Sequence, residues 1–313
     1  MSKLMHIRRR LSFLLSIFES EVKMADTYQK LKSFHPCFGG NRNNTGRIHL
    51  PVSPGCNISC KFCDRKINDH EERPGVTSQV LTPQEAMEVL EKALKLCPEI
   101  TVAGIAGPGD TLATDYALET FRLIREKYPR LIKCMSTNGL LLSERAEEII
   151  EAGVDSLTVT VNGVDPEIEA KLNRLIIYHG KVYIGVEAAA ILIENQLNGI
   201  EKIAAAGITV KVNTVLVPSI NGEHIEDIAK AVKERGAQIY NLIPLIPQSD
   251  LRNEQAPVCS QIEEARALAG KHIDVFRHCQ HCRADAVGLL GGKDYGDLIY
   301  QRRIVGSDTF SHG

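Results

Sequence analysis

The sequence predicts an α/β fold in which a barrel of parallel strands is surrounded by helices. From residue 47 onward, six short stretches rich in Val and Ile alternate with longer helical patterns, which is typical of parallel strands buried on both faces. Polar residues and glycines follow several of these stretches, at "GPGD" (107–110), Asn138, Asn162 and Asn213. Parallel strands of a barrel end at one mouth, whereas in an open sheet their ends spread along an edge. We therefore predict a TIM-type (βα) barrel.

The expected strands and helices follow one another along the chain. The strands are 47–53, 100–107, 131–138, 156–163, 208–218 and 237–245. The first helix, 82–97, has Thr82 as N-cap, Pro83 at its first position and Glu85 to complete a capping box. The later helices are 115–128, 143–153 with Gly153 at its C-cap, a long helical region from 164 through Ala206, and 222–236.

Beyond residue 245 the pattern weakens. We expect a loop over 247–260, a helix over 261–272, a short strand over 273–276, and a glycine-rich tail at 288–296 that runs over the surface. The predicted organisation is an N-terminal extension (1–34), a barrel core (35–250) and a C-terminal extension (251–313).

Composition excludes several classes of protein. The 43% of hydrophobic and 24% of charged residues are ordinary for a soluble globular chain. A net charge of -2 gives no reason to expect nucleic acid or membrane partners, and without Trp no platform for stacking bases is visible. No apolar run approaches the roughly 20 residues of a membrane span.

The redox compartment follows from the N-terminus and the cysteines. Residues 6–23 are basic and then apolar but lack a small-residue cleavage site, so they indicate an amphipathic helix or a loose extension rather than a signal peptide. Nine cysteines, an odd number, without an export signal predict a reduced, cytoplasmic protein.

The segment "PGCNISCKFCDRK" (54–66) spaces Cys56, Cys60 and Cys63 as C-x3-C-x2-C. A four-iron cluster that only carries electrons usually takes four thiolates, so three leave one iron open to an exogenous ligand. Buried structural cysteines rarely lie in so short a loop with Gly55, Asn57 and Ser59. A zinc site would need a distant ligand, and zinc usually takes paired C-x2-C or His partners. An iron–sulfur site is therefore favoured.

This spacing, directly after the first strand of a βα barrel, resembles that of the radical S-adenosylmethionine (SAM) enzymes. The resemblance implies that the open iron chelates the amino and carboxylate groups of SAM, and that one electron cleaves its sulfonium to a 5′-deoxyadenosyl radical. Phe62, before the third cysteine, fits the same pattern.

Other residues at strand ends are candidate SAM contacts. Gly107, Gly109 and Asp110 offer exposed carbonyls and room for close approach, although a plain turn is the alternative. Asn162 and Asn213, with Asn138, are expected to contact SAM unless they only shape turns.

The remaining cysteines include a second set of candidate ligands. "HPCFGG" pairs His35 with Cys37, Cys134 lies within the third strand, and Cys279 and Cys282 form C-x2-C near the C-terminus. Cys97 at a helix end and Cys259 in a loop are expected to be structural.

Six motifs in order closely resemble the NifB family of nitrogenase cofactor maturases, over residues 35 to about 290. They are "HPCF", "CNISCKFCDRK", "RPGVTS", "AGIAGPGD", "STNGL" and "CRADAVG". The resemblance implies SAM-dependent fusion of two [4Fe-4S] clusters into an eight-iron precursor whose central carbide comes from a SAM methyl group. His35, Cys37 and Cys134 would hold one precursor cluster, and Cys279 with Cys282 the other.

The number of ligands agrees with that reading. Five candidates are too few to hold two clusters permanently, which suits clusters that must leave. The implied partners are SAM, iron–sulfur cluster donors, a low-potential electron donor (ferredoxin or flavodoxin) and downstream carriers or scaffolds of the nitrogenase cofactor. The expected fold is thus a radical SAM barrel with N- and C-terminal extensions that carry extra iron–sulfur ligands.

Two departures from the family stand out. The family commonly has a further cysteine before "RPGV", but here "INDHEERPGV" (67–76) has none, and Asp69, His70 or Glu71 are candidate substitutes. Many members carry a C-terminal carrier domain, and we expect none here because the chain ends at 313. Arg283 and Asp285 are either a local ion pair or a support for the cluster ligands beside them.

Two other functions compete with this one. Another radical SAM maturase, for example one that modifies peptides, would use the outer clusters as permanent electron carriers. A non-catalytic cluster carrier would need neither an open iron nor "GPGD", which makes it the weaker alternative.

Overall fold

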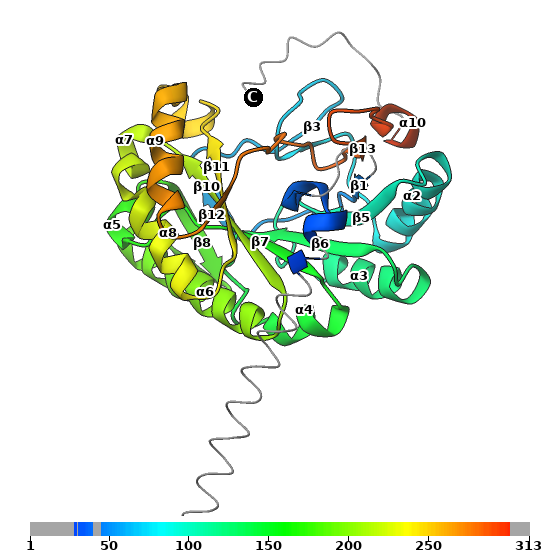
Figure 1. Cartoon of the computed structure of the whole chain (residues 1–313). Coiled ribbons are helices and arrows are strands. Elements are labelled where there is room, and N and C mark those ends of the chain that lie inside the picture. The colour runs from blue at the N-terminus through cyan, green and yellow to red at the C-terminus, as the bar shows by residue number, and fades with distance from the viewer. Residues whose placement is uncertain (1–27, 30, 40–44, 301–313) are drawn as a thin grey trace, which may run out of the picture.

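A computed structural model describes residues 28–29, 31–39 and 45–300. It contains one curved eight-stranded sheet with helices around its outside (Figure 1). In spatial order the strands are β12 (Asp274–Phe276), β11 (Ile239–Pro244), β10 (Thr209–Leu216), β7 (Ser156–Thr160), β6 (Ile132–Thr137), β5 (Ile100–Ile105), β1 (Gly46–His49) and β13 (Val287–Leu289). Neighbouring strands are parallel except β13, which runs antiparallel to β1.

The sheet is a partial barrel, because β12 and β13 lie at its two edges and are not paired with each other. The α/β fold and its parallel strands are confirmed, and the barrel is open rather than closed. All six predicted strands are present, at β1, β5, β6, β7, β10 and β11.

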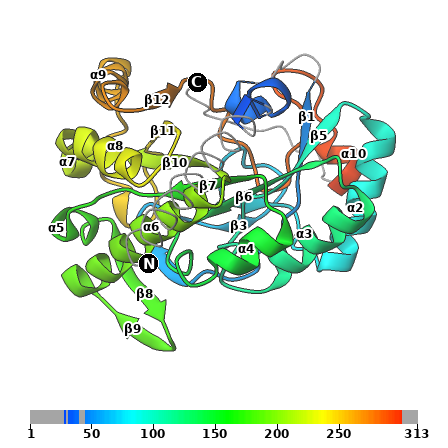
Figure 2. The same cartoon turned by 60° about the horizontal axis from the view of Figure 1, so that its bottom comes forward.

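The helices form an outer layer in which neighbours pack in chain order (Figure 2). They are α2 (Pro83–Leu96), α3 (Tyr116–Lys127), α4 (Ala146–Ala152), α6 (Gly185–Ala205), α8 (Ile225–Glu234) and α9 (Cys259–Gly270). Side chains such as Ile48, Leu157 and Val212 point outward from the sheet and are fully buried in the main hydrophobic core. Their alternate neighbours point into the barrel, which is where the site lies.

Two helix ends follow the sequence closely. Thr82 accepts a hydrogen bond from the Glu85 amide, and the Glu85 carboxylate accepts one from the Thr82 amide, so the capping box is confirmed. Gly153 ends α4 with φ +74°, in the left-handed region that favours glycine.

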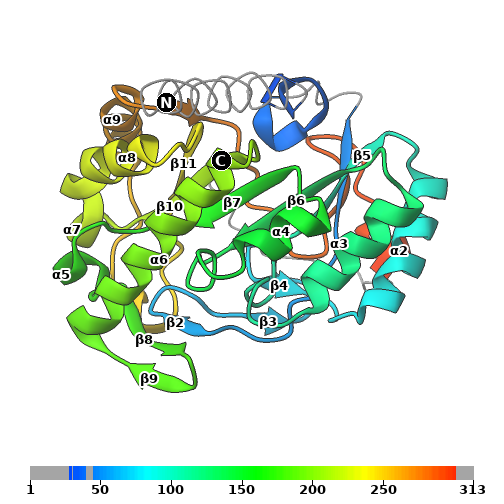
Figure 3. The same cartoon turned by 90° about the horizontal axis from the view of Figure 1, so that it is seen from below.

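The predicted long helix over 164–206 is wrong. The segment contains α5 (Pro166–Glu169), a hairpin of β8 (Asn173–Tyr178) and β9 (Lys181–Tyr183), and only then α6. His179 and Gly180 both have positive φ, as a two-residue hairpin turn requires. β8 also pairs with β2 (Ile58–Cys60), which ends at the second cysteine of the C-x3-C-x2-C loop (Figure 3). Pairing with β2 stabilises β8 as a strand in a segment for which a helix was predicted.

The glycine-rich tail is only partly the surface segment that was predicted, because residues 291–294 are exposed and the residues on either side of them are packed. Its first residues belong to β13, and α10 (Gly296–Tyr300) packs against α2. Gly288 is required there, because an added Cβ would lie 2.2 Å from the Lys293 carbonyl oxygen. The predicted strand at 273–276 is β12. Cys97 is buried at the end of α2 as expected, whereas Cys259 is the exposed first residue of α9 rather than a loop residue.

The smaller elements complete the chain. They are η1 (Pro36–Phe38), β3 (Lys66–Ile67), β4 (Val76–Thr77), α7 (Pro218–Asn221), η2 (Gly222–His224) and η3 (Ser249–Leu251). The expected N-terminal helix or extension at 6–23 lies outside the described residues. Within the described residues, no helix has the length and apolar character that crossing a membrane requires.

Candidate active site at the barrel interior

The C-x3-C-x2-C loop, residues 54–66, is held from two sides. On one side β2 pairs with β8, and the Lys61 amide donates to the Leu172 carbonyl at 2.8 Å. On the other side, the amides of Gly109 and Asp110 donate to the carbonyls of Ser53 and Gly55, each at 2.8 Å. The loop is thus fixed between the hairpin and the end of β5.

The three cysteines of this loop are half-buried free thiols. Burial raises the pKa of Cys56, Cys60 and Cys63, and the nearby Arg65 guanidinium opposes the rise at each. Removing three protons here therefore needs a cation to bind the thiolates, which an iron–sulfur core supplies. Three thiols on one braced loop, with a cationic side chain beside them, fit a [4Fe-4S] cluster that keeps one iron open.

Within the part of the chain that the structure describes, no three His, Cys, Asp or Glu side chains converge on one point as ligands of a single metal ion. A zinc ion needs ligand atoms about 2.0–2.3 Å from one centre. The thiolates of a four-iron cluster bind different irons, so they do not have to converge in this way.

The "GPGD" segment supports the cysteine loop directly. An added Cβ at Gly109 would lie 1.9 Å from the Gly55 carbonyl oxygen, so the missing side chain lets two backbone segments meet. Gly107 has φ +128°, which also favours glycine. The glycines were expected to make room for a cofactor. At Gly109, however, the missing side chain makes room for the cysteine loop.

Asp110 is buried, and its carboxylate accepts hydrogen bonds from the ends of β5 and β6. Its carboxylate accepts from the Thr137 hydroxyl at 2.9 Å and from the amides of Asn138 and Leu112 at 2.6 and 3.0 Å. Burial raises its pKa, and these bonds oppose the rise. Asn138 in turn donates to Asn57 at 2.7 Å and lies 3.8 Å from the Cys56 sulfur. Asp110 therefore ties the ends of β5 and β6 to the cysteine loop.

A cavity of about 310 Å³ occupies the barrel interior. It brings together all five outer candidate ligands with Phe62 and Cys63 of the cysteine loop and Asn213 of β10; the five are His35, Cys37, Cys134, Cys279 and Cys282. Asn162 does not line it, because this buried side chain accepts a hydrogen bond from the Val215 amide.

The cavity extends well below the mouth of the barrel. Phe38 of η1 packs against Val102 and Ile132, at the N-terminal ends of β5 and β6, so η1 closes that end. Cys134 is in the middle of β6. The outer candidate ligands thus lie inside the barrel, whereas the candidate SAM contacts were predicted at the C-terminal ends of the strands.

Three functional candidates in the cavity were missed from the sequence: Arg47, His49 and Lys211. Arg47 and His49 occupy alternate positions in β1, and Lys211 lies in β10. Both strands were predicted to be buried on both faces. The signal was present, because "RIH" and "KVN" alternate polar and apolar residues as a strand with one polar face does. Among the residues that the structure describes, no Asp or Glu lines this cavity.

His35 caps η1 as well as lining the cavity. Its Nδ1 accepts a hydrogen bond from the Cys37 amide at 3.1 Å, and its buried Nε2 has no partner. Burial lowers its pKa well below the usual value, so the ring is neutral. With Nδ1 as the acceptor, Nε2 carries the hydrogen. In this tautomer His35 presents a donor, and binding iron through Nε2 would require the other tautomer.

His49 presents the opposite nitrogen. Its Nδ1 lies 2.9 Å from the Arg283 carbonyl oxygen and must donate to it, so Nε2 is left with a free lone pair. Burial, assisted by the Arg47 charge, lowers its pKa to about 4. A ring nitrogen fixed by a backbone carbonyl is the usual arrangement of a metal-binding histidine.

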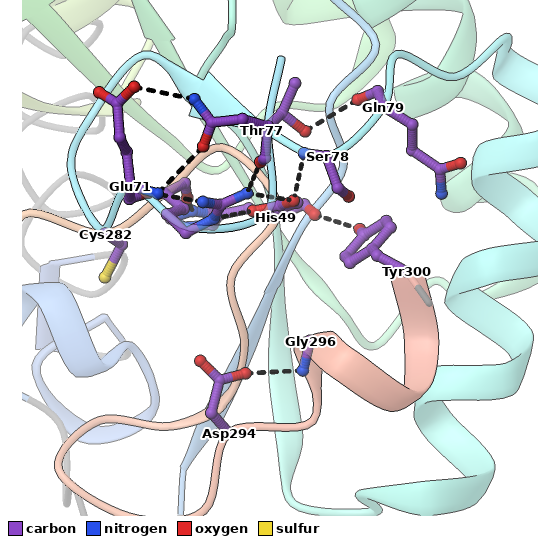
Figure 4. Close-up of polar contacts among 12 residues, drawn as sticks. His49, Glu71, Thr77, Ser78, Gln79, Cys282, Asp294, Gly296 and Tyr300 are labelled. Atoms are coloured by element: carbon purple, nitrogen blue, oxygen red, sulfur yellow. Dashed lines mark hydrogen bonds and ion pairs between the residues drawn. The ribbon is translucent and has the colours of Figure 1, made fainter. Parts of the chain in front are cut away.

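Arg283 and Asp285 form the local ion pair that was one of the two alternatives. Both are almost fully buried, and Arg283 Nε lies 2.8 Å from an Asp285 oxygen. Arg283 donates further to the carbonyls of Asn68 and Glu71, and Asp285 accepts from the Ser78 amide. Figure 4 shows Glu71, Ser78 and His49 in the same region as Cys282. The pair joins the loop 68–78 and β1 to the C-x2-C segment.

The candidate substitutes for the missing family cysteine do not reach the cavity. Asp69, His70 and Glu71 are absent from its lining. Glu71 instead pairs with Arg73 at 2.7 Å and with Lys66 at 3.3 Å. The structure gives these three side chains no place among the outer ligands.

Comparison with known proteins agrees with the site. Residues 50–232 match the family model of the radical SAM superfamily. Two relatives named FeMo cofactor biosynthesis protein NifB, from Methanocaldococcus infernus and Methanocaldococcus jannaschii, are each 46% identical, over 87% and 84% of this chain and 90% and 88% of theirs. The protein of that name from Azotobacter vinelandii is 39% identical over 84% of this chain and 54% of its own length.

Solved structures resemble the fold at low sequence identity. Streptococcus suis SuiB bound to S-adenosylmethionine matches with a TM-score of 0.52 at 12% identity, over 85% of this chain and 50% of that one. Methylornithine synthase (PylB) matches with a TM-score of 0.50 at 14% identity, over 82% and 70%. Identity to the NifB relatives over most of the chain, together with the superfamily match, shows that this radical SAM enzyme belongs to the NifB family.

Proposed function

We propose that this enzyme fuses two [4Fe-4S] clusters into the eight-iron, carbide-centred precursor of the nitrogenase cofactor, with the carbide drawn from a SAM methyl group. One [4Fe-4S] cluster on Cys56, Cys60 and Cys63 is the resident cofactor, and the other two are substrates. The name of the relatives, FeMo cofactor biosynthesis protein, supports the pathway.

One observation carries this proposal. Candidate ligands from three distant parts of the chain, at residues 35–37, 134 and 279–282, line a single cavity that also reaches Cys63. Two precursor clusters held there would lie beside each other and beside the SAM site. A fusion reaction needs that proximity, whereas separate electron carriers do not.

The outer ligand set is small, which suits substrates. His35, Cys37 and Cys134 serve one precursor, and Cys279 with Cys282 the other. For the second precursor we add His49, whose Nε2 lone pair is free and whose ring is held by the residue after Cys282. His49 thus takes the role for which Asp69, His70 and Glu71 were the candidates.

The resident cluster, when bound, supplies the electron that cleaves SAM. The chain's own residues position that chemistry: Asp110 and Gly109 hold the cysteine loop, and Asn138 orients Asn57 next to Cys56. Asn213 and Phe62 line the cavity, where SAM contacts are expected. Asn162 fixes the end of β10 through the Val215 amide and thereby shapes the same region.

The proposed partners follow from the reaction. The enzyme must receive four-iron clusters from donors and electrons from a low-potential ferredoxin or flavodoxin, and it must pass its product to a carrier or scaffold protein. We place it in the cytoplasm, where thiols stay reduced.

The test uses Cys134→Ala and Cys279→Ala, with Cys259→Ala as the matched control because Cys259 is an exposed thiol on α9 outside the cavity. Each cavity variant should lose one outer cluster, stop forming the fused product and still cleave SAM at least in part. Iron content, 5′-deoxyadenosine and S-adenosylhomocysteine are measured together.

The alternatives give other results. If the outer clusters are permanent electron carriers, both variants should depress 5′-deoxyadenosine formation itself. If the protein is only a carrier, even the parent chain should not cleave SAM. A fused cluster that still formed in both variants would refute the substrate assignment.

A further inference from the structure

The cavity carries positive charge, and no acidic side chain of the described residues lines it. Asp294 acts electrostatically on Arg47 from outside the lining. Arg47 and Lys211 both line the cavity. Neither residue forms an ion pair with a carboxylate in the described part of the chain. Buried cations are normally paired, because removing a charge from water is costly.

Lys211 is held on the side of the first precursor site. It is 7% exposed, and its Nζ lies 5.0 Å from the centre of the Phe38 ring and 5.5 Å from that of Phe276. Burial raises the pKa of Cys37 to about 12 and also raises that of Cys134, and the Lys211 charge opposes both effects. The ammonium therefore lies near two aromatic rings in the cavity that both thiols line, and its charge acts on both thiols.

Arg47 is held on the side of the second precursor site. Its Nη1 donates to the Gly288 carbonyl at 2.8 Å, which anchors the guanidinium against β13. Its Nη2 donates to the Cys282 sulfur at 3.4 Å, and its buried Nε has no partner. One cation thus stands at each of the two groups of outer thiols.

We propose that Lys211 and Arg47 are electrostatic anchors that hold the anionic precursor clusters in the cavity, Lys211 beside Cys37 and Cys134 and Arg47 beside Cys282. This inference rests on the proposed function. Each thiolate ligand and each bridging sulfide is anionic, so a cluster brings the negative charge that the cavity walls lack. A site that holds a cluster through few covalent ligands depends most on such charges to keep the cluster bound.

The competing explanation is that Lys211 is a core residue that only stabilises the fold. Cation–π contacts with Phe38 and Phe276 recover a small part of what burial of an ammonium costs. The two explanations differ for the cluster-free chain. A buried cation without its anion destabilises the cluster-free chain, so if Lys211 is an anchor, its neutral replacement should not lower the free energy of unfolding. If Lys211 stabilises the fold, the same replacement should lower it.

The experiment compares Lys211→Met and Lys211→Arg with the parent, and Lys230→Met is the control because Lys230 is exposed on α8. Proteins reconstituted with iron and sulfide are challenged with an iron chelator. Iron is followed with time, and the resident cluster is followed separately through the change that SAM causes in its EPR spectrum. Urea unfolding of the cluster-free proteins is measured in parallel.

We expect Lys211→Met to lose outer-cluster iron about tenfold faster than the parent, which is a modest effect for one unit charge near a buried anion. Lys211→Arg should restore the parent rate to within about twofold, because it keeps the charge. The resident cluster should not change, and cluster-free Lys211→Met should be at least as stable as the parent. Arg47→Gln, tested in the same way, should release iron faster as well.

Three results would overturn the inference. They are an unchanged rate of iron loss in Lys211→Met, equally fast loss in Lys211→Arg, or a cluster-free Lys211→Met chain less stable than the parent. If the parent holds only the resident cluster, the proposed function fails together with this inference. If the parent holds outer clusters that Cys134→Ala and Cys279→Ala reduce but Lys211→Met does not affect, only the inference fails.

Discussion

Replacing Gly109 with alanine should dislodge the cysteine loop. The new Cβ would lie 1.9 Å from the Gly55 carbonyl oxygen and 2.8 Å from that of Ser53. Both contacts are with backbone atoms, so no side-chain rotation can relieve them. The two segments must separate by about 1 Å or more, which takes hydrogen bonds of 2.8 Å out of the normal range of about 2.7–3.2 Å.

The size of the effect follows from those bonds. The Gly109 and Asp110 amides both donate to the loop, and each such bond contributes roughly 0.5–1.5 kcal/mol. Leaving a buried partner unsatisfied adds about 1–3 kcal/mol. We therefore expect Gly109→Ala to lower the free energy of unfolding by about 2–4 kcal/mol, or to release the loop and lose the resident cluster.

The matched control is Gly55→Ala, in the same loop, where an added Cβ meets only a Thr114 methyl at 4.0 Å. Urea unfolding gives the stability of each variant, and EPR with 5′-deoxyadenosine yield reports the resident cluster. Gly55→Ala should stay within about 1 kcal/mol of the parent. If Gly109→Ala matched Gly55→Ala in both stability and cluster occupancy, the steric reasoning would be refuted.

Three further predictions concern the cysteine loop, the segment 67–76 and a buried carboxyl group. Cys56→Ala, Cys60→Ala or Cys63→Ala should abolish SAM cleavage while the outer clusters still bind; undiminished 5′-deoxyadenosine would contradict this. Asp69→Ala and His70→Ala should leave the outer clusters intact, whereas His49→Ala should weaken the binding of one of them; iron counts and EPR spectra measure both. If Asp69→Ala or His70→Ala lost an outer cluster and His49→Ala did not, the ligand would come from the segment 67–76 instead. Burial raises the pKa of Glu169 from 4.5 to about 8, so the folded state favours the protonated form and loses stability as the pH rises between those values. Glu169→Gln should therefore gain stability over the parent, by up to a few kcal/mol at pH 8 and little at pH 4.5, in urea unfolding; a gain independent of pH, or one shared by the exposed Glu187→Gln, would count against that assignment.

Periodic patterns in the sequence were enough for most of the fold. Val- and Ile-rich stretches and capped helices predicted β1, β5, β6, β7, β10 and β11 and the helices between them, except in the segment 164–206. The hairpin β8–β9 was missed because its stability comes from pairing with β2, more than a hundred residues earlier. Strand β13 was missed for a similar reason, since its partner β1 lies at the other end of the chain.

The site was predictable where its chemistry is local. That Cys56, Cys60 and Cys63 lie together could be predicted from spacing alone, because one loop holds all three. The gathering of Cys37, Cys134 and Cys279 in one cavity depends on the spatial order of strands, which spacing does not encode. His49 and Lys211 could have been found from the alternation within their strands, had one face of each been assigned to the interior.

The cavity combines two properties that suit substrate clusters on the proposed function. Burial makes a free Cys37 thiolate unfavourable, with a pKa of about 12, so a thiolate that loses its iron tends to take up a proton. That change removes a covalent ligand, but it leaves the charges of Lys211 and Arg47 in place. As two clusters merge and give up thiolates, the product would be held increasingly by charge and less by ligands. A site of this kind can keep an intermediate during the reaction and still release the product to a protein that offers new ligands.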